Sequence, residues 1–402
     1  MNTRRKVRLT REGWYYAIVL GFIIGGAVLR EVNLLFVLSA LMMGPLFFSW
    51  RFARQMLGGL RIERRTPGRA HAGESVSIAL TIANPRRFSS SWAVAAIDHW
   101  QSHLSAVSTT VRRETAFFAH VAPRSSATAQ YVWIPPTRGR FRFDRIRLTT
   151  RFPFGFLQAW FDVTQETELL VAPRLGRMLP AWRSWIERAA RGEEAASQRR
   201  GVRAGDYYGL REWRPGDSRR WIHWRSSARQ GHLTTLQFEE PRQLDILLLV
   251  DLWAPLKPSP RELEKVELAL SMAATMITEF GRHSQCSLRL GLAGAPAHAW
   301  STPVSAGIRG GMLDAMAEIQ PSPDPEWRAA APQLPLGQSW GRIVVISTRP
   351  QPADLRPFMQ AIATHDSSLE SLTPHWIEVD AARARELFEM PVATTPVAEA
   401  SA

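Results

Sequence analysis

Two long apolar runs stand near the beginning of the chain, and only Arg30 and Glu31 separate them. The runs cover residues 14–29 and 32–50. Each is close to the length at which a helix crosses a ~30 Å hydrocarbon layer, the first being slightly short. A signal peptide is a poor interpretation of the first run, because no small-residue cleavage site follows and the second run begins at once. We therefore expect a transmembrane helical hairpin over residues 1–58.

Basic residues flank this hairpin on both sides. Residues 1–70 contain twelve Lys or Arg and three acids, so they carry +9 of the +14 net charge of the whole chain. Because cytoplasmic flanks are enriched in Lys and Arg, both ends of the hairpin are expected in the cytoplasm. The sequence thus predicts a multi-pass protein of the inner (cytoplasmic) membrane, with lipid as a partner and its soluble domains in the cytoplasm. A buried helical hairpin of a soluble protein is the alternative, which the flank charge and the span lengths disfavour.

Residues 59–174 change to the alternating pattern of half-buried strands. Val76, Ile78, Leu80 and Ile82 alternate with small or polar residues before a turn at residues 84–85. Several similar short runs follow, separated by Pro and Gly, which favours an antiparallel β-sandwich. The histidines of this region lack the spacing of metal ligands, and we expect them at the surface: His71, His99, His103 and His120. The aromatic turn at residues 152–156 is expected to pack over one end of the sandwich.

Strand and helix patterns alternate in the last part of the chain. Residues 175–204 are interpreted as a connector, residues 205–390 as a doubly wound α/β domain, and residues 391–402 as a flexible tail. An unbroken apolar run ends at Asp251, as a parallel strand buried on both faces does. Ligands of such sheets bind at the carboxyl ends of strands, so Asp251 is the first candidate ligand residue. The single cysteine, Cys286, excludes a disulfide framework and a multi-cysteine metal site.

One stretch, residues 205–232, mixes arginine and tryptophan at unusual density: GDYYGLREWRPGDSRRWIHWRSSARQGH. Residues 208–213 read as a strand, residues 214–217 as a turn, and residues 221–224 as part of a short helix capped by Asp217 or Ser218. Three interpretations stay open. The tryptophans can be buried between domains with arginines stacked on them, the arginines can form an exposed face for an acidic partner, or the stretch can bind single-stranded nucleic acid. Five acids within residues 206–240 make the nucleic-acid interpretation the weakest.

The same stretch, extended to residue 241, resembles the signature of the domain-of-unknown-function 58 family. The pattern Tyr-Gly-Leu-Arg-Glu-Tyr-Arg-Pro-Gly-Asp, followed by Ile-x-Trp and Ser-Ala-Arg, is matched except that Trp213 stands in place of Tyr. The matching residues are Tyr208, Gly209, Leu210, Arg211, Glu212, Arg214, Pro215, Gly216, Asp217, Ile222, Trp224, Ser227, Ala228, Arg229, Gly231 and Glu239. The run TRGRFRFDRIRLTTRFPFGF in the β-rich region is similar to a second segment of that family, with Phe152 in place of Asp.

The resemblance implies a bacterial membrane protein with a von Willebrand factor A-like C-terminal domain. Such proteins usually accompany MoxR-type AAA+ ATPases and are thought to act as chaperone-like or assembly partners. The von Willebrand A fold often binds a divalent metal through Asp-x-Ser-x-Ser after its first strand. Here Asp251 is followed by Trp253 and Pro255 in place of both serines, so most oxygen ligands for a hard cation are missing and the metal site is degenerate.

We therefore expect a membrane-anchored cytoplasmic protein-interaction and assembly factor, without a cofactor and without enzymatic activity, that works with a MoxR-type ATPase. A metal-dependent adhesion module is the first alternative, and a hydrolase of cell-envelope precursors, using His223 with Asp217, is the second. The residues expected to bind a partner or to form a domain interface are Tyr208, Arg211, Glu212, Arg214, Asp217, Arg219, Arg220, Trp221, Trp224, Arg225 and Arg229. Nucleotide, zinc and nucleophile-elbow motifs are missing from the sequence.

Overall fold

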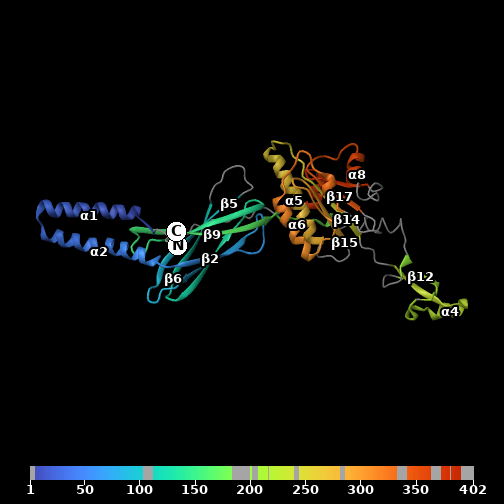
Figure 1. The fold of residues 1–402 in the computed structure, drawn as a ribbon, viewed down its shortest axis with the longest axis horizontal. Helices are drawn as coiled ribbons and strands as arrows, with labels where there is room; N and C mark the ends of the chain where they lie inside the picture. The colour runs from blue at the N-terminus through green and yellow to red at the C-terminus, as the bar shows by residue number, and fades with distance from the viewer. Residues whose placement is uncertain are drawn as a thin grey trace. The chain divides into compact units, whose positions relative to one another are not determined.

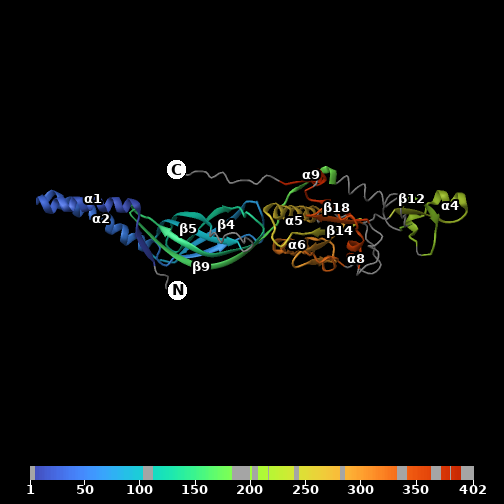
Figure 2. The same cartoon turned by 90° about the horizontal axis from the view of Figure 1, so that it is seen from above.

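A computed structural model describes residues 5–102, 112–182, 200–201, 207–215, 217–239, 244–280, 286–332, 342–363, 373–380 and 382–390. The chain divides into two compact units, Met1–Arg174 and Leu175–Val392. Figure 1 shows the fold coloured along the chain, and Figure 2 shows it from above. Each unit is described by itself below.

The first unit begins with a helical hairpin. Helix α1 spans Arg11–Arg30 and α2 spans Asn33–Met56, and both are long and apolar enough to cross a membrane. Only 17% and 11% of their most apolar windows are buried, so large side chains such as Phe22 and Leu41 face outward. Helix α2 runs beyond the predicted apolar run and carries Arg51 and Arg54 in its last turns. Its C-terminal end packs into the core of the β-sandwich through Ala53 and Leu57.

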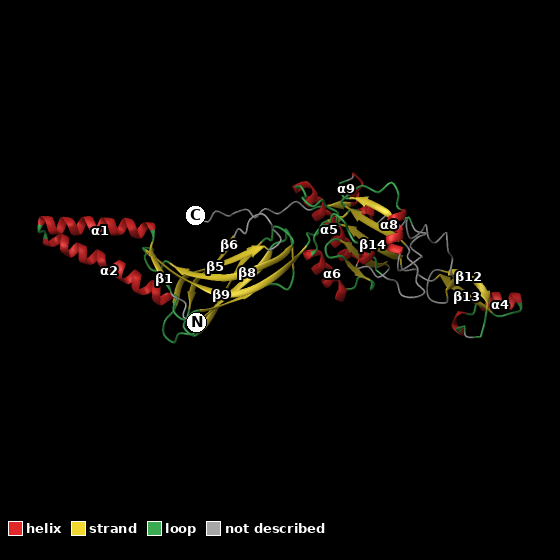
Figure 3. Ribbon diagram, turned by 45° about the horizontal axis from the view of Figure 1, so that its top comes forward, coloured by secondary structure: helices red, strands yellow, loops and turns green. Residues whose placement is uncertain are grey.

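A six-stranded sheet forms one layer of the sandwich (Figure 3). Its strands, in spatial order, are β1 (Lys6–Leu9), β9 (Leu157–Ala172), β8 (Gly139–Thr150), β5 (Ser91–Ser102) and β6 (Arg112–Val121), and β3 (Ala70–His71) pairs with β9. The second layer is a three-stranded sheet of β2 (Arg61–Arg65), β4 (Val76–Asn84) and β7 (Ser125–Trp133). All pairings are antiparallel except that of β3 with β9. The predicted sheet-rich region is confirmed, but β1, which precedes the first helix, was not predicted.

Aromatic rings fill the space between the two layers. Trp133 of β7 lies edge-on to Phe141 and Phe143 of β8, with ring centroids 5.1 and 5.3 Å apart, and all three side chains are buried. The expectation that the histidines lie at the surface is wrong for His99, which is 1% exposed within β5. Burial there lowers its pKa, as do the charges of nearby arginines. His103 lies outside the described residues.

The aromatic turn at residues 152–156 contacts the base of the first helix as well as the sandwich. The ring of Tyr16 in α1 stacks on Phe156 at 4.3 Å, and the hydroxyl of Thr10 donates to the carbonyl of Gly155 at 2.7 Å. A Cβ atom on Gly13 would lie 2.0 Å from the carbonyl oxygen of Phe156, so this close approach requires glycine. The turn therefore fixes where α1 leaves the sandwich.

The second unit contains a small three-stranded antiparallel sheet in the order β11 (Arg200–Gly201), β13 (Thr234–Glu239) and β12 (Tyr207–Glu212). Between β12 and β13 lie a 3-10 helix, η1 (Arg219–Trp221), and helix α4 (Trp224–Gln230). The sequence predicted one short helix here. The structure has two pieces because Ile222 leaves the helical conformation to pair with Thr235 as an isolated bridge.

A five-stranded sheet forms the rest of the second unit. Its spatial order is β16 (His298–Trp300), β15 (Cys286–Ala293), β14 (Leu244–Asp251), β17 (Arg342–Ser347) and β18 (His375–Glu378), of which only β16 runs antiparallel. The helices are α5 (Pro260–Phe280), α6 (Ala306–Glu318), α7 (Trp327–Ala330), α8 (Arg356–Ile362) and α9 (Ala382–Leu387), and β10 (Arg177–Met178) pairs with β19 (Phe388–Glu389). The parallel α/β pattern matches the sequence prediction, whereas the antiparallel edge strand was not predicted.

Candidate functional site

An ion pair organises the turn that follows β12. Arg211 donates two hydrogen bonds to the carboxylate of Asp217, at 2.6 and 2.7 Å, and the backbone N–H of Arg214 donates a third at 2.9 Å. These bonds, the one from Arg211 first, lower the pKa of Asp217 to about 2. Asp217 thus closes the Arg-Pro-Gly-Asp turn and does not cap the helix that follows, which corrects the sequence prediction.

Helix α4 is capped at its start and held against β13 by hydrogen bonds between side chains and the backbone. The ring nitrogen Nδ1 of His223 accepts from the backbone N–H of Ser226 at the start of the helix, at 3.3 Å. The hydroxyl of Ser227 accepts from the backbone N–H of Thr234 at 2.9 Å. Gly231, in the left-handed conformation at φ 75°, ends the helix. His223 and Asp217 therefore bond to different partners, and the acid–base pair considered from the sequence does not form.

The remaining arginines of the stretch face outward. Arg214, Arg219, Arg220, Arg225 and Arg229 are all exposed. Within the part of the chain that the structure describes, none of these side chains pairs with a carboxylate. The guanidinium of Arg220 lies 5.8 Å from the ring centroid of Trp221.

The tryptophans do not behave alike. Trp224 is 67% exposed, so its ring is not buried within the small sheet and helix that carry it. Trp221 and Trp213 are partly buried, and the backbone N–H of Trp213 donates to the carbonyl of Leu233 at 2.8 Å. Glu212 is exposed, whereas the side chain of Tyr208 lies outside the described part of the structure. The stretch thus combines an internally bonded scaffold with an exposed face of arginines and one tryptophan.

Asp251 ends β14 at the point where the strand order of the sheet reverses, between β14 and β17. Its side chain is fully buried, and its Oδ2 accepts from the hydroxyl of Ser347 and from Nε of Arg349, both at 2.8 Å. The guanidinium of Arg349 also lies 6.0 Å from the ring of Trp253. The strand that the sequence predicted does end at Asp251, but the sequence did not identify its partners, because Ser347 at the end of β17 and Arg349 just after it lie almost 100 residues later.

Desolvation raises the pKa of Asp251, although the charge of Arg349 and the two hydrogen bonds act in the opposite direction. The positive guanidinium of Arg349 bonds Oδ2 of this carboxylate, and it would repel a divalent cation placed beside it, since like charges repel. Among the described residues, no three His, Cys, Asp or Glu side chains lie together as a metal-binding group. The residues present therefore do not fit the metal site that the von Willebrand A resemblance suggests.

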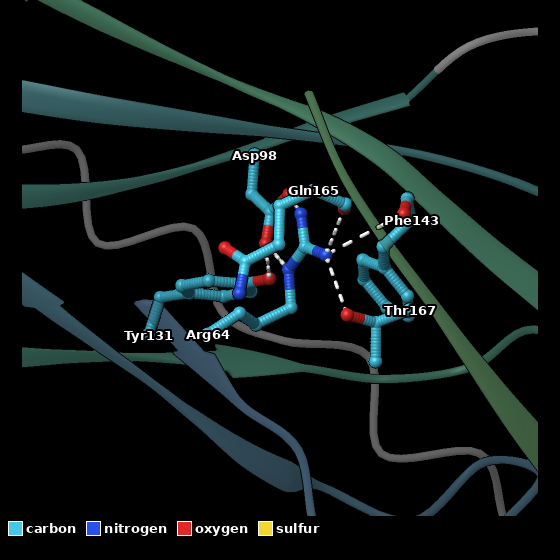
Figure 4. A network of polar contacts seen from close by, with 6 residues as sticks. All are labelled: Arg64, Asp98, Tyr131, Phe143, Gln165 and Thr167. Atoms are coloured by element: carbon cyan, nitrogen blue, oxygen red, sulfur yellow. Dashed lines mark hydrogen bonds and ion pairs between the residues drawn. The ribbon is translucent and has the colours of Figure 1, made fainter. Parts of the chain in front are cut away.

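A second buried ion pair, which the sequence did not reveal, lies within the sandwich (Figure 4). Arg64 of β2 donates to the carboxylate of Asp98 in β5 at 2.5 and 2.8 Å, and the hydroxyl of Tyr131 in β7 donates to the same group at 2.8 Å. Arg64 also reaches the carbonyl of Gln165 and the hydroxyl of Thr167 in β9. The sequence suggested for Arg64 only a role in membrane topology, since it stands in the basic flank of the hairpin.

Comparison with protein families finds one described as "Protein of unknown function DUF58", which matches residues 209–329. This supports the family resemblance for the signature and the first part of the α/β region. No curated protein matches the chain.

Solved structures similar to parts of the chain include a CARDB domain from Pyrococcus furiosus, at 14% identity over 28% of this chain and 94% of that one, with a TM-score of 0.18. A β-glucosidase from Listeria innocua in complex with gluconolactone is 16% identical over 28% of this chain and 16% of that one, with a TM-score of 0.20. Spo0M, a sporulation control protein from Bacillus subtilis, is 12% identical over 39% of this chain and 58% of that one, with a TM-score of 0.18. Scores this low carry no argument about fold or function.

Proposed function

We propose that this protein is a membrane-anchored assembly factor whose cytoplasmic part binds an acidic protein partner through the exposed arginines and Trp224. The observation that carries the proposal is the contrast within the signature stretch. Arg211 and Asp217 are bonded to each other within the turn, whereas Arg219, Arg220 and Trp224 are exposed. In the described part of the chain, neither of these two arginines pairs with a carboxylate.

The chemistry of this face favours a protein partner. Arginine and tryptophan are enriched at the energetic centres of protein interfaces, since both present large, semi-rigid contact surfaces. The scaffold bonds restrain the backbone that carries the face, which reduces the entropy lost on binding. The resemblance to the family suggests a MoxR-type AAA+ ATPase as the partner and a von Willebrand A-like fold for the five-stranded α/β region.

The proposed anchor is the α1–α2 hairpin, oriented with both flanks in the cytoplasm of the inner membrane. Its support is the outward-facing apolar surface of two helices of 20 and 24 residues, together with the basic flanks. Protease added outside intact cells should leave the chain after residue 60 undigested. Digestion of that part, or a full-length chain that stays soluble without detergent or lipid, would refute the anchor.

The partner face is tested by recovery of the acidic partner on the full-length chain in detergent, with the MoxR-type ATPase of the same cell as the first candidate. Charge reversal by Arg219→Glu with Arg220→Glu should lower recovery at least tenfold, because each reversal replaces attraction by repulsion. The control is Arg328→Glu with Arg385→Glu, which reverses two exposed arginines of the same unit outside the face. Equal recovery by both double variants would refute the face.

A further inference from the structure

A hollow of about 450 Å³ lies where helix α2 meets the sandwich, and four arginines converge on it. They come from three separate parts of the first unit: Arg5 from the segment before β1, Arg51 and Arg54 from the end of α2, and Arg86 from the loop after β4. Gln55 and Ser89 complete the polar lining. The volume is within the range of small-molecule sites, ~300–1,000 Å³.

No carboxylate in the described residues neutralises these four charges. Burial, and then the neighbouring charge of Arg5, lower the pKa of Arg86. Positive groups held this close without a counter-charge repel one another, and an anion placed between them removes that repulsion. The hollow is therefore matched to a negatively charged ligand.

The four arginines divide into one that is fixed and three that keep free donors. Arg86 donates to the backbone carbonyls of Gln55 and Met56 at the end of α2, to the side chain of Asn84 at 2.9 Å, and to the hydroxyl of Ser91. A guanidinium at this end also complements the negative end of the helix dipole. Arg86 is thus a positioning residue that holds the wall of the hollow.

The other three use few of their donors within the protein. Arg5 makes one long bond, 3.5 Å, to the carbonyl of Arg54, and Arg51 makes one of 2.8 Å to Gln55. The guanidinium of Arg54 rests 5.3 Å from the ring centroid of Trp50. Each guanidinium carries five N–H donors in a planar fork, which suits the paired oxygens of a phosphate better than a point charge does.

In the proposed membrane anchor, the position along α2 would put the hollow at the level of the lipid headgroups. Trp50 ends the apolar run, and interfacial tryptophans lie at the boundary of the hydrocarbon layer. Arg54 follows four residues later, which is ~6 Å along a helix. The polar layer on each side of the hydrocarbon is about 5–8 Å thick, so a hairpin that spans the membrane would hold Arg51 and Arg54 within this layer.

We propose that the hollow formed by Arg5, Arg51, Arg54 and Arg86 binds the phosphate group of an anionic phospholipid of the cytoplasmic leaflet. The proposal rests on the proposed membrane anchor and adds a specific lipid site to it. Such a bond ties α2 and the sandwich to the headgroup layer at one point, and it stabilises the angle at which the cytoplasmic part leaves the membrane.

The test is native mass spectrometry of the full-length chain in a nonionic detergent, titrated separately with phosphatidylglycerol, phosphatidylcholine and inorganic phosphate. We expect one phosphatidylglycerol to bind at least tenfold more tightly than either of the others. Arg51→Gln with Arg54→Gln should weaken it tenfold or more, because charge-assisted hydrogen bonds are lost. Arg54→Lys, which keeps the charge but loses the fork, should give part of that loss.

The matched control is Arg65→Gln with Arg87→Gln, which removes two exposed arginines of the first unit that do not line the hollow. It should change the affinity less than about twofold, and circular dichroism should show both double variants folded. Equal weakening by the two double variants would overturn the site in favour of general surface charge. Tight binding of inorganic phosphate with no gain from lipid would overturn the lipid assignment. A chain that needs detergent but binds phosphatidylglycerol unchanged in the Arg51 and Arg54 variant refutes this site and leaves the anchor standing.

Discussion

Replacing Asp98 by Asn should destabilise the sandwich strongly, because it leaves the charge of Arg64 buried without a counter-charge. Both side chains are 0% exposed, and Arg64 bonds the carboxylate through two nitrogens, at 2.5 and 2.8 Å. Breaking a buried ion pair by removing one partner costs about 3–5 kcal/mol. For a unit of this size each kcal/mol lowers the melting temperature by ~2–4 °C, which gives a decrease of roughly 6–20 °C.

Hydrogen exchange of the full-length chain in detergent measures this loss in one unit without mixing it with the other. Peptides from Ser91–Ser102 and Ser125–Trp133 report on the sandwich. If these strands exchange by unfolding of the whole sandwich, 3–5 kcal/mol corresponds to exchange ~10²–10⁴ times faster. Peptides from Leu244–Asp251, in the second unit, should be unchanged.

Two further variants test whether the burial of the charges sets the loss of stability. Asp162→Asn breaks the pair with Arg147, whose side chains are 36% and 30% exposed, so its cost should stay below about 1 kcal/mol. Arg64→Met combined with Asp98→Leu removes both buried charges and should recover most of the stability lost in Asp98→Asn. A similar loss of stability in Asp98→Asn and Asp162→Asn, or no recovery in the combined variant, would show that the buried charge of Arg64 is not the cause of the loss.

Three other outcomes follow from the structure. Because Arg211 holds the pKa of Asp217 at about 2, below its unfolded value, the ion pair stabilises the turn above about pH 4 and is lost as the pH falls through about 2. Amide exchange across residues 211–217 should show this pH dependence, and a loss of protection already near pH 4 would contradict it. Gly291→Ala should destabilise the second unit by about 1–3 kcal/mol in thermal unfolding, because the new Cβ would lie 2.0 Å from the carbonyl oxygen of Ala330. An unchanged melting temperature would contradict this, since it would mean that the backbone shifts to make room for the methyl group. Asp251→Asn should lower the free energy of unfolding less than Asp98→Asn does, because Arg349, the partner of Asp251, is 33% exposed and can turn toward water. Equal losses of stability in urea unfolding would refute this.

The sequence alone determined the features that depend on local pattern. Continuous apolar runs predicted two helices long enough to cross a membrane, and alternation at Val76–Asn84 predicted a half-buried strand. The unbroken run before Asp251 predicted a strand buried on both faces. These predictions hold because periodicity is a property of neighbouring residues and is the direct consequence of which face meets the core.

Only the tertiary structure decided which charged residues belong together. Arg64 and Asp98, or Asp251 and Arg349, are 34 and 98 residues apart, and nothing in their local sequence distinguishes a buried partner from a solvated one. The same holds for the arginine hollow, where Arg86 reaches α2 across 30 residues. Strand pairing and chain reversal bring such groups together, and their electrostatic energy depends on distance and burial, neither of which is encoded in spacing along the chain.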